Sequence, residues 1–584
     1  MTITVPVPDG LSLASLNVTA ELPIYLRGAD LTVTQDKQFI ARVPIPAQRG
    51  QLIIPLANAK VVEKSVTLRL RADLLPADRY CIDPNLPLRL TDASATYAGG
   101  ERAPAVVADF LPAVLRKLVI YVNAKPSQAE ANAAIQLAEA VAAHYGSQNP
   151  VIELAPLVGP DARPAGAGAP MERHIVVTEG TDAGLSLYGS GGIPGMRITA
   201  RSDQLVNQVR LLTSSLANYA VAPRVVAGQL KSDARPIGNE ATLADLGQQD
   251  LTDEGINPQV DVPIDQTRIG RPVHHVQVHL RGTYTPLPAG LGGEIVVSAG
   301  GKTVARWAAE PSGSIDRMID VPDRLLKRYT TLTVAVNEAG NTGDCGAYQP
   351  MTLTIDSATS VRSEPSSGSV PGFQSVVQSL LPKVQIGVGS DVFGDTARAL
   401  QVMIGLQRLS SVPIDTAVVG LRDAAASRDP AVLIAPGGLD DANVSLPVST
   451  SGSGPMTLNV VDKSGAPATL TLDPGVRIGS LQVVSNGSKP MLVATSNGAP
   501  GQLDKLIGWL SADPWQWSAL DGMAVLAIDD REPFVVAVPD TVTSAPGGAG
   551  SSVPVALWWI GGVVLAAVIG VGAWRLIRHR GSRA

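Results

Sequence analysis

The sequence predicts a multidomain β and α/β protein, in which two β-sandwiches alternate with two α/β domains before one C-terminal transmembrane helix. Three observations predict this arrangement. Stretches that alternate apolar with polar residues give way to buried strands and helices, this change occurs twice, and a long uncharged segment stands near the end of the chain. The length of 584 residues corresponds to about four domains of roughly 100–200 residues each.

The first β-sandwich is expected over residues 10–110. The stretches Phe39–Val43, Leu52–Pro55 and Val66–Leu70 alternate apolar with polar residues. Successive side chains of a strand point to opposite faces of a sheet, so this period is typical of strands with one buried face.

The pattern changes to α/β character over residues 111–230. Lys117–Val122 and His174–Thr178 are apolar runs that favour buried strands, while Gln128–Tyr145 and Gln204–Tyr219 have helical spacing. Strands that alternate with helices predict a parallel sheet covered by helices.

The same succession then returns. A polar stretch, 231–264, is predicted to be a linker, residues 265–362 to form a second β-sandwich, and residues 373–540 a second α/β domain. Strands of the second sandwich are expected at Val273–Leu280, Glu294–Ser298, Thr331–Val336 and Met351–Ile355. The second α/β domain should have strands at Lys383–Val388, Ala431–Ala435 and Met491–Thr495, and helices at Thr396–Leu409 and Gln502–Leu510.

The repeat is also visible in the residues themselves. The run VTLRL is followed by Cys81 and LRLTDAS, and the run TLTVAV is followed by Cys345 and LTIDSAT. In the α/β regions, MRITARSDQLVNQVRLL resembles MLVATSNGAPGQLDKLIGWL. The duplicated order indicates an ancestral pair of domains that was copied once.

Composition excludes several classes of protein. The formal net charge is −6 and no basic run precedes the last residues, so a nucleic-acid partner is not expected. Two cysteines, Cys81 and Cys345, exclude a disulfide framework and a cysteine-rich zinc site. Whether these two cysteines pair with each other stays open.

The residues from 553 to 577 are predicted to cross a membrane after a linker at 541–552. The uncharged part, Val553–Trp574, is about 22 residues, or roughly 33 Å of helix. By the positive-inside rule, the tail 578–584 is cytoplasmic and the preceding bulk extracytoplasmic. The residues assigned to the membrane interfaces are Trp558, Trp559, Trp574, Arg575, Arg578 and Arg580. An ectodomain of this size needs an export signal, which we expect to be encoded upstream or already removed.

Gly562, Ala566 and Gly570 recur every four residues within this segment. Small residues at this spacing let another helix approach closely, which indicates a partner in the membrane. Glycine and alanine are also common in membrane helices, so chance spacing stays an alternative.

Motifs for catalysis and for phosphate binding are weak. Gly387–Gly394 follows a strand and precedes a helix, but Val392 stands where a dinucleotide fingerprint has glycine, so a plain βα turn is predicted. Gly301–Thr303 resembles the end of a P-loop, but Ala299–Lys302 is predicted to be the turn of a hairpin. Gly189–Gly195 is predicted to be a loop. No nucleophile elbow or convincing carboxylate pair is found, so we expect no catalytic residue and no cofactor.

Half of the six histidines lie at His274, His275 and His279. Strand alternation would place His275 and His279 on one face, and we interpret them as a solvated strand face. A metal site would also need convergent ligands and an acidic neighbour, neither of which the sequence identifies. No metal site is therefore predicted.

Trp515 and Trp517 stand close together in a chain with only 4% aromatic residues. They fit either a partner-docking element or the core of the last α/β domain. Both interpretations stay open.

Two cysteine-bearing segments carry a resemblance to a known family: VTLRLRADLLPADRYCIDPNLPLRLTDAS and IDVPDRLLKRYTTLTVAVNEAGNTGDCGAYQPMTLTIDSATS. Together with the domain order and the C-terminal helix, they resemble the bacterial cellulose synthase regulatory subunit family, whose members are often labelled cyclic di-GMP-binding proteins. The resemblance extends from about residue 10 to the membrane segment, and its specificity comes from the order and duplication of short motifs.

The resemblance implies two jelly-roll, carbohydrate-binding-like sandwiches and two flavodoxin-like domains without flavin. It implies a non-catalytic, inner-membrane accessory protein, whose membrane helix packs on a glycosyltransferase that polymerises glucose from UDP-glucose. The ectodomain would receive or guide the exported polysaccharide, and cyclic di-GMP would act only through the catalytic partner. Candidate glycan or partner contacts are Trp307, Tyr348, Trp515 and Trp517, with Tyr25 and Tyr80 as further aromatic candidates.

Two other functions stay open. One is an envelope adhesion or scaffold protein with the same anchor, and the other is an envelope glycosidase or esterase.

Overall fold

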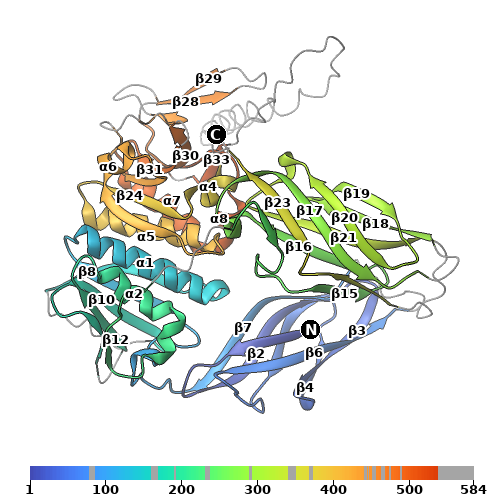
Figure 1. Cartoon of the computed structure of the whole chain (residues 1–584). Coiled ribbons are helices and arrows are strands. Elements are labelled where there is room, and N and C mark those ends of the chain that lie inside the picture. The colour runs from blue at the N-terminus through green and yellow to red at the C-terminus, as the bar shows by residue number, and fades with distance from the viewer. Residues whose placement is uncertain are drawn as a thin grey trace, which may run out of the picture. The chain divides into compact units, whose positions relative to one another are not determined.

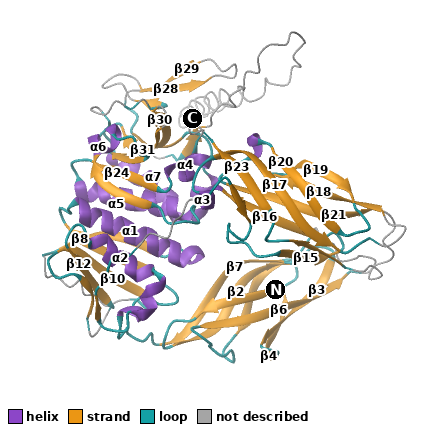
Figure 2. Cartoon of the chain, viewed as in Figure 1, coloured by secondary structure: helices purple, strands orange, loops and turns teal. Residues whose placement is uncertain are grey.

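A computed structural model describes most of the chain up to residue 536. The protein is rich in β-strands and has several domains (Figures 1 and 2). The described residues are 1–77, 86–159, 169–189, 193–230, 237–287, 292–339, 350–366, 372–439, 444, 446–449, 456–461, 467–472, 475–486, 489–529 and 531–536, with side chains at 449–472 and 486 left aside. Among these residues, no helix has the length and apolar character needed to span a membrane. The predicted membrane segment, both cysteines, Tyr80 and Tyr348 lie outside the described residues.

The first β region consists of two sheets packed around an apolar core. Alternation builds this core: in β6 the side chains of Val66, Leu68 and Leu70 are buried, while Thr67 and Arg69 between them are exposed. One sheet has the order β1-β6-β3-β4 and the other β5-β2-β7. The strands are β1 (Thr2–Pro6), β2 (Leu11–Glu21), β3 (Leu26–Gln35), β4 (Gln38–Ile45), β5 (Arg49–Pro55), β6 (Ser65–Pro76) and β7 (Arg89–Gly99). Strand β1 pairs with β6, so the sandwich begins before the expected residue 10.

The second β region repeats the order of these strands and adds two, β14 and β15, that have no counterpart among the described strands of the first. The order β16-β21-β18-β19 matches β1-β6-β3-β4, and β20-β17, with β22 and β23 along the other side of β17, matches β5-β2-β7. The elements are β14 (Glu240–Thr242), β15 (Leu251–Gly255), β16 (Gln259–Asp265), α3 (Gln266–Ile269), β17 (Val273–Tyr284), β18 (Gly292–Ala299), β19 (Lys302–Ala308), β20 (Ser314–Val321), η4 (Asp323–Leu325), β21 (Tyr329–Ala339), β22 (Met351–Ile355) and β23 (Ser360–Pro365).

The prediction of a linker at 231–264 is wrong, because three strands of the second β region, β14, β15 and β16, lie largely within it. Each pairs with a strand near the end of the second β region. Two of these strands are short and largely exposed, so their sequences lack the apolar alternation that identifies half-buried strands.

The first α/β region has the sheet order β13-β11-β12-β10-β8-β9, in which β9, β8, β10 and β12 are parallel. Its elements are η1 (Val107–Asp109), β8 (Lys117–Asn123), α1 (Gln128–Tyr145), η2 (Gly146–Gln148), β9 (Val151–Leu157), β10 (Glu172–Glu179), β11 (Gly184–Tyr188), β12 (Gly195–Ala200), α2 (Leu205–Thr213), η3 (Ser215–Tyr219) and β13 (Arg224–Val225). The predicted helix Gln128–Tyr145 is confirmed residue for residue.

The second α/β region has the order β25-β24-β26-β31-β30-β32-β33, and a small sheet β27-β28-β29 is inserted after β26. In both regions an antiparallel strand, β11 or β30, directly precedes the fourth parallel strand. The elements are α4 (Phe373–Leu380), β24 (Lys383–Val388), α5 (Val392–Arg408), β25 (Asp415–Gly420), α6 (Leu421–Ala426), β26 (Ala431–Ala435), β27 (Val448–Ser449), β28 (Met456–Val461), β29 (Pro467–Leu472), β30 (Ile478–Asn486), β31 (Lys489–Ser496), α7 (Pro500–Ala512), α8 (Pro514–Ala519), β32 (Ala524–Ile528) and β33 (Phe534–Val536).

Helix α1 of the first α/β region packs against α5 of the second, and their apolar residues form one continuous core (Figure 1). Two side-chain hydrogen bonds join the two regions. The Gln136 amide donates to the Thr416 carbonyl at 3.0 Å, and the Gln401 amide donates to the Ile152 carbonyl at 2.7 Å. Arg210 also donates to the Asp415 carboxylate at 2.7 Å. The shared core therefore links two domains that the sequence separates by the second β region.

Candidate functional site

Parallel α/β sheets of this order bind ligands beyond the carboxyl ends of their strands, where the strand order reverses. In this protein these points lie after β8 and β10 in the first α/β region, and after β24 and β26 in the second. An anion would bind there to the free backbone N–H groups at the start of α1 or α5.

A carboxylate of the protein itself lies at this point in the first region. Ser127 caps α1, and Glu130 in the first turn accepts the Ser127 backbone N–H at 3.1 Å and the Glu179 backbone N–H, at the end of β10, at 2.9 Å. The Asn123 amide donates to the same carboxylate at 2.7 Å. Glu130 is buried, so a side chain of the protein itself occupies this point between β8 and β10.

The second region has the same arrangement with different residues. Asp395 in the first turn of α5 is only 1% exposed and accepts the Gly389 backbone N–H at 2.9 Å, directly after β24. Burial raises the pKa of Asp395, and Arg398, 3.1 Å away, opposes that shift. Arg398 in turn binds Asp504 of α7 through two hydrogen bonds of 2.7 and 3.1 Å.

Both loops therefore have a buried carboxyl side chain of the protein at the switch point of the sheet. The sequence signal for the first was readable, because Ser127 and Glu130 have the S-x-x-E spacing of a capping box. Asp395 had no such signal, because its partner is the backbone N–H of Gly389 in the same loop and no residue type marks that bond. Gly387–Gly394 forms the βα turn that the sequence predicts.

The two tryptophans of α8 have different environments. Trp517 is 3% exposed and packs on Gly405 of α5, whereas Trp515 is 78% exposed. Trp517 is therefore a core residue, and Trp515 alone of the two presents an indole on the surface.

The remaining aromatic candidates pack largely against the sandwiches. Trp307 on β19 is half-buried against the core of the second β region, opposite Ile295 of β18. Tyr25 is buried and its hydroxyl donates to the Leu86 carbonyl at 3.0 Å. The other predicted site residues, namely Tyr348, Trp558, Trp559, Gly562, Ala566, Gly570, Trp574, Arg575, Arg578 and Arg580, lie outside the described residues.

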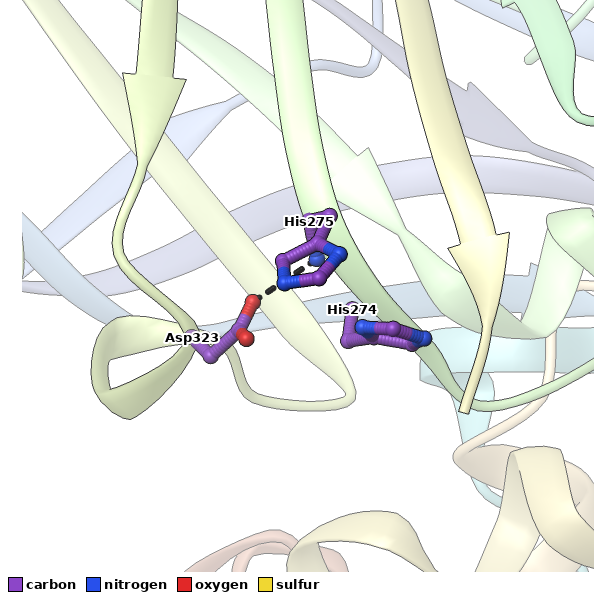
Figure 3. Close-up of side chains that lie close together, drawn as sticks. All are labelled: His274, His275 and Asp323. Carbon is purple, nitrogen blue, oxygen red and sulfur yellow. Dashed lines mark hydrogen bonds between the residues drawn. The ribbon is translucent and has the colours of Figure 1, made fainter. Parts of the chain in front are cut away.

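The histidines of β17 lie in a way that strand alternation did not predict (Figure 3). The pairing of β17 with β23 is interrupted by a bulge between His274 and Gln277, and His275 has a positive φ of 50°. As a result the rings of the consecutive residues His274 and His275 lie side by side, with centroids 4.3 Å apart. His279 lies elsewhere on the strand and contacts Asp316 at 2.6 Å. His279 thus lies apart from the His274–His275 pair. Val276, Val278 and Leu280 are buried while His275, Gln277 and His279 are not, so the predicted solvated face of this strand is confirmed.

Asp323, in the 3-10 turn η4 that follows β20, completes this group. Its carboxylate accepts the His275 backbone N–H at 2.8 Å, and one ligand atom from each of Asp323, His274 and His275 lies within 4.8 Å of the others. Glu364 of β23 lies 3.4 Å from the Nδ1 atom of His275. Sequence alone offered no signal for Asp323 or Glu364, which are far from the histidines along the chain.

A buried acid lies on the face of α1 that is directed toward the second α/β region. Glu139 is 3% exposed, and neither of its carboxylate oxygens has a hydrogen-bond partner among the described residues. Burial, and next the negative charge of Asp415, raise the pKa of Glu139 well above its usual value. Glu139 therefore favours its neutral form in the folded protein.

A cavity of about 180 Å³ lies where the first β region meets the first α/β region. Arg173, whose side chain is 2% exposed, lines it and donates to Glu101 at 2.5 Å and to the Phe110 carbonyl at 2.6 Å. Its guanidinium is thus already neutralised within the protein.

The chain matches no known protein family and no curated protein. Among solved structures it is similar to the M60 catalytic domain with two CBM51 domains of ZmpB from Clostridium perfringens, at 9% identity and a TM-score of 0.16, covering 83% of this chain and 39% of that one. It is also similar to a family two carbohydrate esterase from Clostridium thermocellum, at 6% identity and a TM-score of 0.12, covering 30% of this chain and 46% of that one. An acetyl xylan esterase from Butyrivibrio proteoclasticus has 12% identity and a TM-score of 0.10, covering 26% and 39%. The chain spans less than half the length of each, and TM-scores this low carry no argument about fold or function.

Proposed function

We propose that this protein is a non-catalytic, membrane-anchored accessory subunit of a cellulose-synthase-like complex. The observation that carries the proposal is the repeat of a β-sandwich and α/β pair, whose two copies share most of their strand order. This is the domain order that the resemblance to the cellulose synthase regulatory subunit family implies. The parallel order β9-β8-β10-β12, repeated as β25-β24-β26-β31, is also that of flavodoxin-like domains.

The two α/β loops support a role without a nucleotide or flavin. Each has a buried carboxyl side chain, Glu130 or Asp395, that accepts a backbone N–H from a residue at or directly after the end of a neighbouring strand. Displacing that carboxylate would leave it without its hydrogen bonds beside a second negative charge, which is costly in a buried site. In this proposal the α/β domains act as a scaffold.

The proposed role assigns different tasks to the parts of the chain. Residues 553–577 anchor the protein in the inner membrane and pack on the UDP-glucose-using glycosyltransferase through Gly562, Ala566 and Gly570. The extracytoplasmic bulk receives or guides the emerging glucan, for which exposed Trp515 and half-buried Trp307 offer aromatic surface. In this proposal cyclic di-GMP acts only indirectly, through the catalytic partner.

Co-purification from detergent-solubilised membranes tests the proposal. The full chain should bring down a multi-span glycosyltransferase, and changing Gly562, Ala566 and Gly570 together to leucine should disrupt that complex, because the added side chains hold the helices apart. The matched control changes Val564 and Val568, on the opposite face of the helix, to leucine and should leave the complex intact. Recovery of the wild-type protein without any glycosyltransferase would contradict the proposed function and favour an envelope scaffold.

A further inference from the structure

We propose that His274, His275 and Asp323 form a binding site for one Zn²⁺ ion on the second β-sandwich. The inference rests on three features: two adjacent imidazoles brought together by a bulge, a carboxylate fixed beside them, and a second carboxylate next to the His275 ring. It does not depend on the proposed function.

The bulge is the feature that creates the site. Consecutive residues of a regular strand point to opposite faces of the sheet, so His274 and His275 would be separated by the strand itself. The left-handed conformation of His275, at φ 50°, interrupts this alternation and sets the two rings 4.3 Å apart. Such a conformation is uncommon for a residue other than glycine and costs free energy, which indicates that the surrounding structure enforces it.

The carboxylate of Asp323 is already directed at this pair. Figure 3 shows it reaching toward His275 from the turn after β20, while His274 lies next to His275 from the same strand. The hydrogen bond of 2.8 Å from the His275 backbone N–H holds one of its oxygens in place. Because His275 and Asp323 are exposed and His274 is partly exposed, an ion reaches all three from solvent.

The donor set selects the class of ion. Two imidazole nitrogens and one carboxylate oxygen suit Zn²⁺ and neighbouring transition metals, whereas Ca²⁺ and Mg²⁺ prefer all-oxygen sites. Tetrahedral zinc with bonds of about 2.0–2.1 Å holds its ligand atoms about 3.3 Å apart. The three ligand atoms lie within 4.8 Å of one another, so closure needs only side-chain rotation, for which the exposed His275 and Asp323 have room.

Glu364 supplies the acidic neighbour that zinc-binding histidines use. Its carboxylate lies 3.4 Å from His275 Nδ1, where it would orient the ring and leave the other ring nitrogen for the metal. The ion would then join the start of β17 to the turn after β20, beside the end of β23. Strand β23 is the last element before the second α/β region, so the metal would fix the exit of the sandwich.

Metal titration of the full chain tests the site. The detergent-solubilised protein, purified without a histidine tag and stripped with EDTA, is titrated with Zn²⁺ alone by calorimetry and with Co²⁺ by visible absorption. We expect one Zn²⁺ per chain, a Co²⁺ spectrum typical of four-coordinate nitrogen and oxygen ligation, and a Zn²⁺-dependent rise in melting temperature.

The variants are chosen to remove ligands without disturbing the backbone. His275→Asn keeps a residue that tolerates positive φ, and Asp323→Asn keeps an oxygen for the His275 N–H. Each should weaken Zn²⁺ binding at least 10-fold, as should His274→Gln, and Glu364→Gln should weaken it about 10- to 100-fold. The matched control His279→Asn removes a histidine of the same strand and should bind Zn²⁺ like the wild type.

Melting without metal shows whether each variant is folded. The site is refuted if the wild type binds no Zn²⁺ at 100-fold excess over the protein, or if a folded His274→Gln/His275→Asn double variant binds it as tightly as the wild type.

Discussion

The contact between Trp517 and Gly405 predicts that the same substitution has opposite effects at two helical glycines of one domain. At Gly405 in α5, an added Cβ would lie 2.1 Å from Cε2 of the Trp517 ring and 2.4 Å from its Nε1. The ring is buried and rigid, so α5 and α8 must move apart. At Gly508 in α7, nothing lies within 4 Å of the added Cβ.

The magnitudes follow from overpacking and from helix propensity. Gly405→Ala gains up to about 1 kcal/mol from the helix but loses about 1–3 kcal/mol from overpacking, and with a clash this close we expect a net loss of about 1–2 kcal/mol. Gly508→Ala should stabilise α7 by about 0.5–1 kcal/mol. Combining Gly405→Ala with Trp517→Leu should remove the clash, so the two changes should cost less together than their sum.

Hydrogen exchange measured by mass spectrometry suits a multidomain chain, because it reports the free energy of opening for each segment. Peptides of α5 and α8 should exchange about 5- to 30-fold faster in Gly405→Ala than in the wild type, and peptides of α7 should exchange more slowly in Gly508→Ala. Stabilisation of α5 by Gly405→Ala would refute the packing of Trp517 and reopen its interpretation as a docking residue.

Three further predictions concern buried charges and caps. Because the folded-state pKa of Glu139 is raised, the folded protein binds more protons than the unfolded chain above the usual pKa of 4.5, so stability from this group falls as pH rises above that value. Glu139→Gln should remove that part of the pH dependence, measured as the melting temperature between about pH 5 and 8, and an unchanged slope would contradict the burial of Glu139. Arg173→Met should destabilise the first α/β region by about 3–5 kcal/mol, because it leaves Glu101 without its buried partner, and Glu101→Gln/Arg173→Met should recover part of the loss in denaturant unfolding. Ser127→Ala should lower the stability of the first α/β region by about 0.5–2 kcal/mol, because it removes the N-cap of α1. Equal hydrogen-exchange rates for the first turn of α1 in the variant and the wild type would show that the capping box does not stabilise the helix.

The regular elements were largely predictable, because their periodicity is a local property. The helix Gln128–Tyr145 and the strands Lys383–Val388 and Ala431–Ala435 have the bounds that the sequence predicts. The duplication was predictable for the same reason, since each copy repeats its own local pattern. Strands β14 and β15 were missed, because they are short and largely exposed and their pairing partners come only near the end of the second β region.

The candidate sites were much less predictable. Of the residues that fill the two α/β loops, only Glu130 had a local signal, through its spacing from Ser127. Asp395 depends on a backbone amide, and the separation of Trp515 from Trp517 depends on which face of the short helix α8 meets α5. Residue types alone therefore predict neither the hydrogen bond of Asp395 nor which of the two tryptophans is buried.

The sequence by itself determined the alternation of β and α/β domains, their duplication and the apolar C-terminal segment, because hydrophobic period and run length act over a few residues. Only the tertiary structure decided that His274 lies beside His275 and that Asp323 and Glu364 reach them. A β-bulge and the register of three strands bring these side chains together, and register is set by burial across the whole sheet.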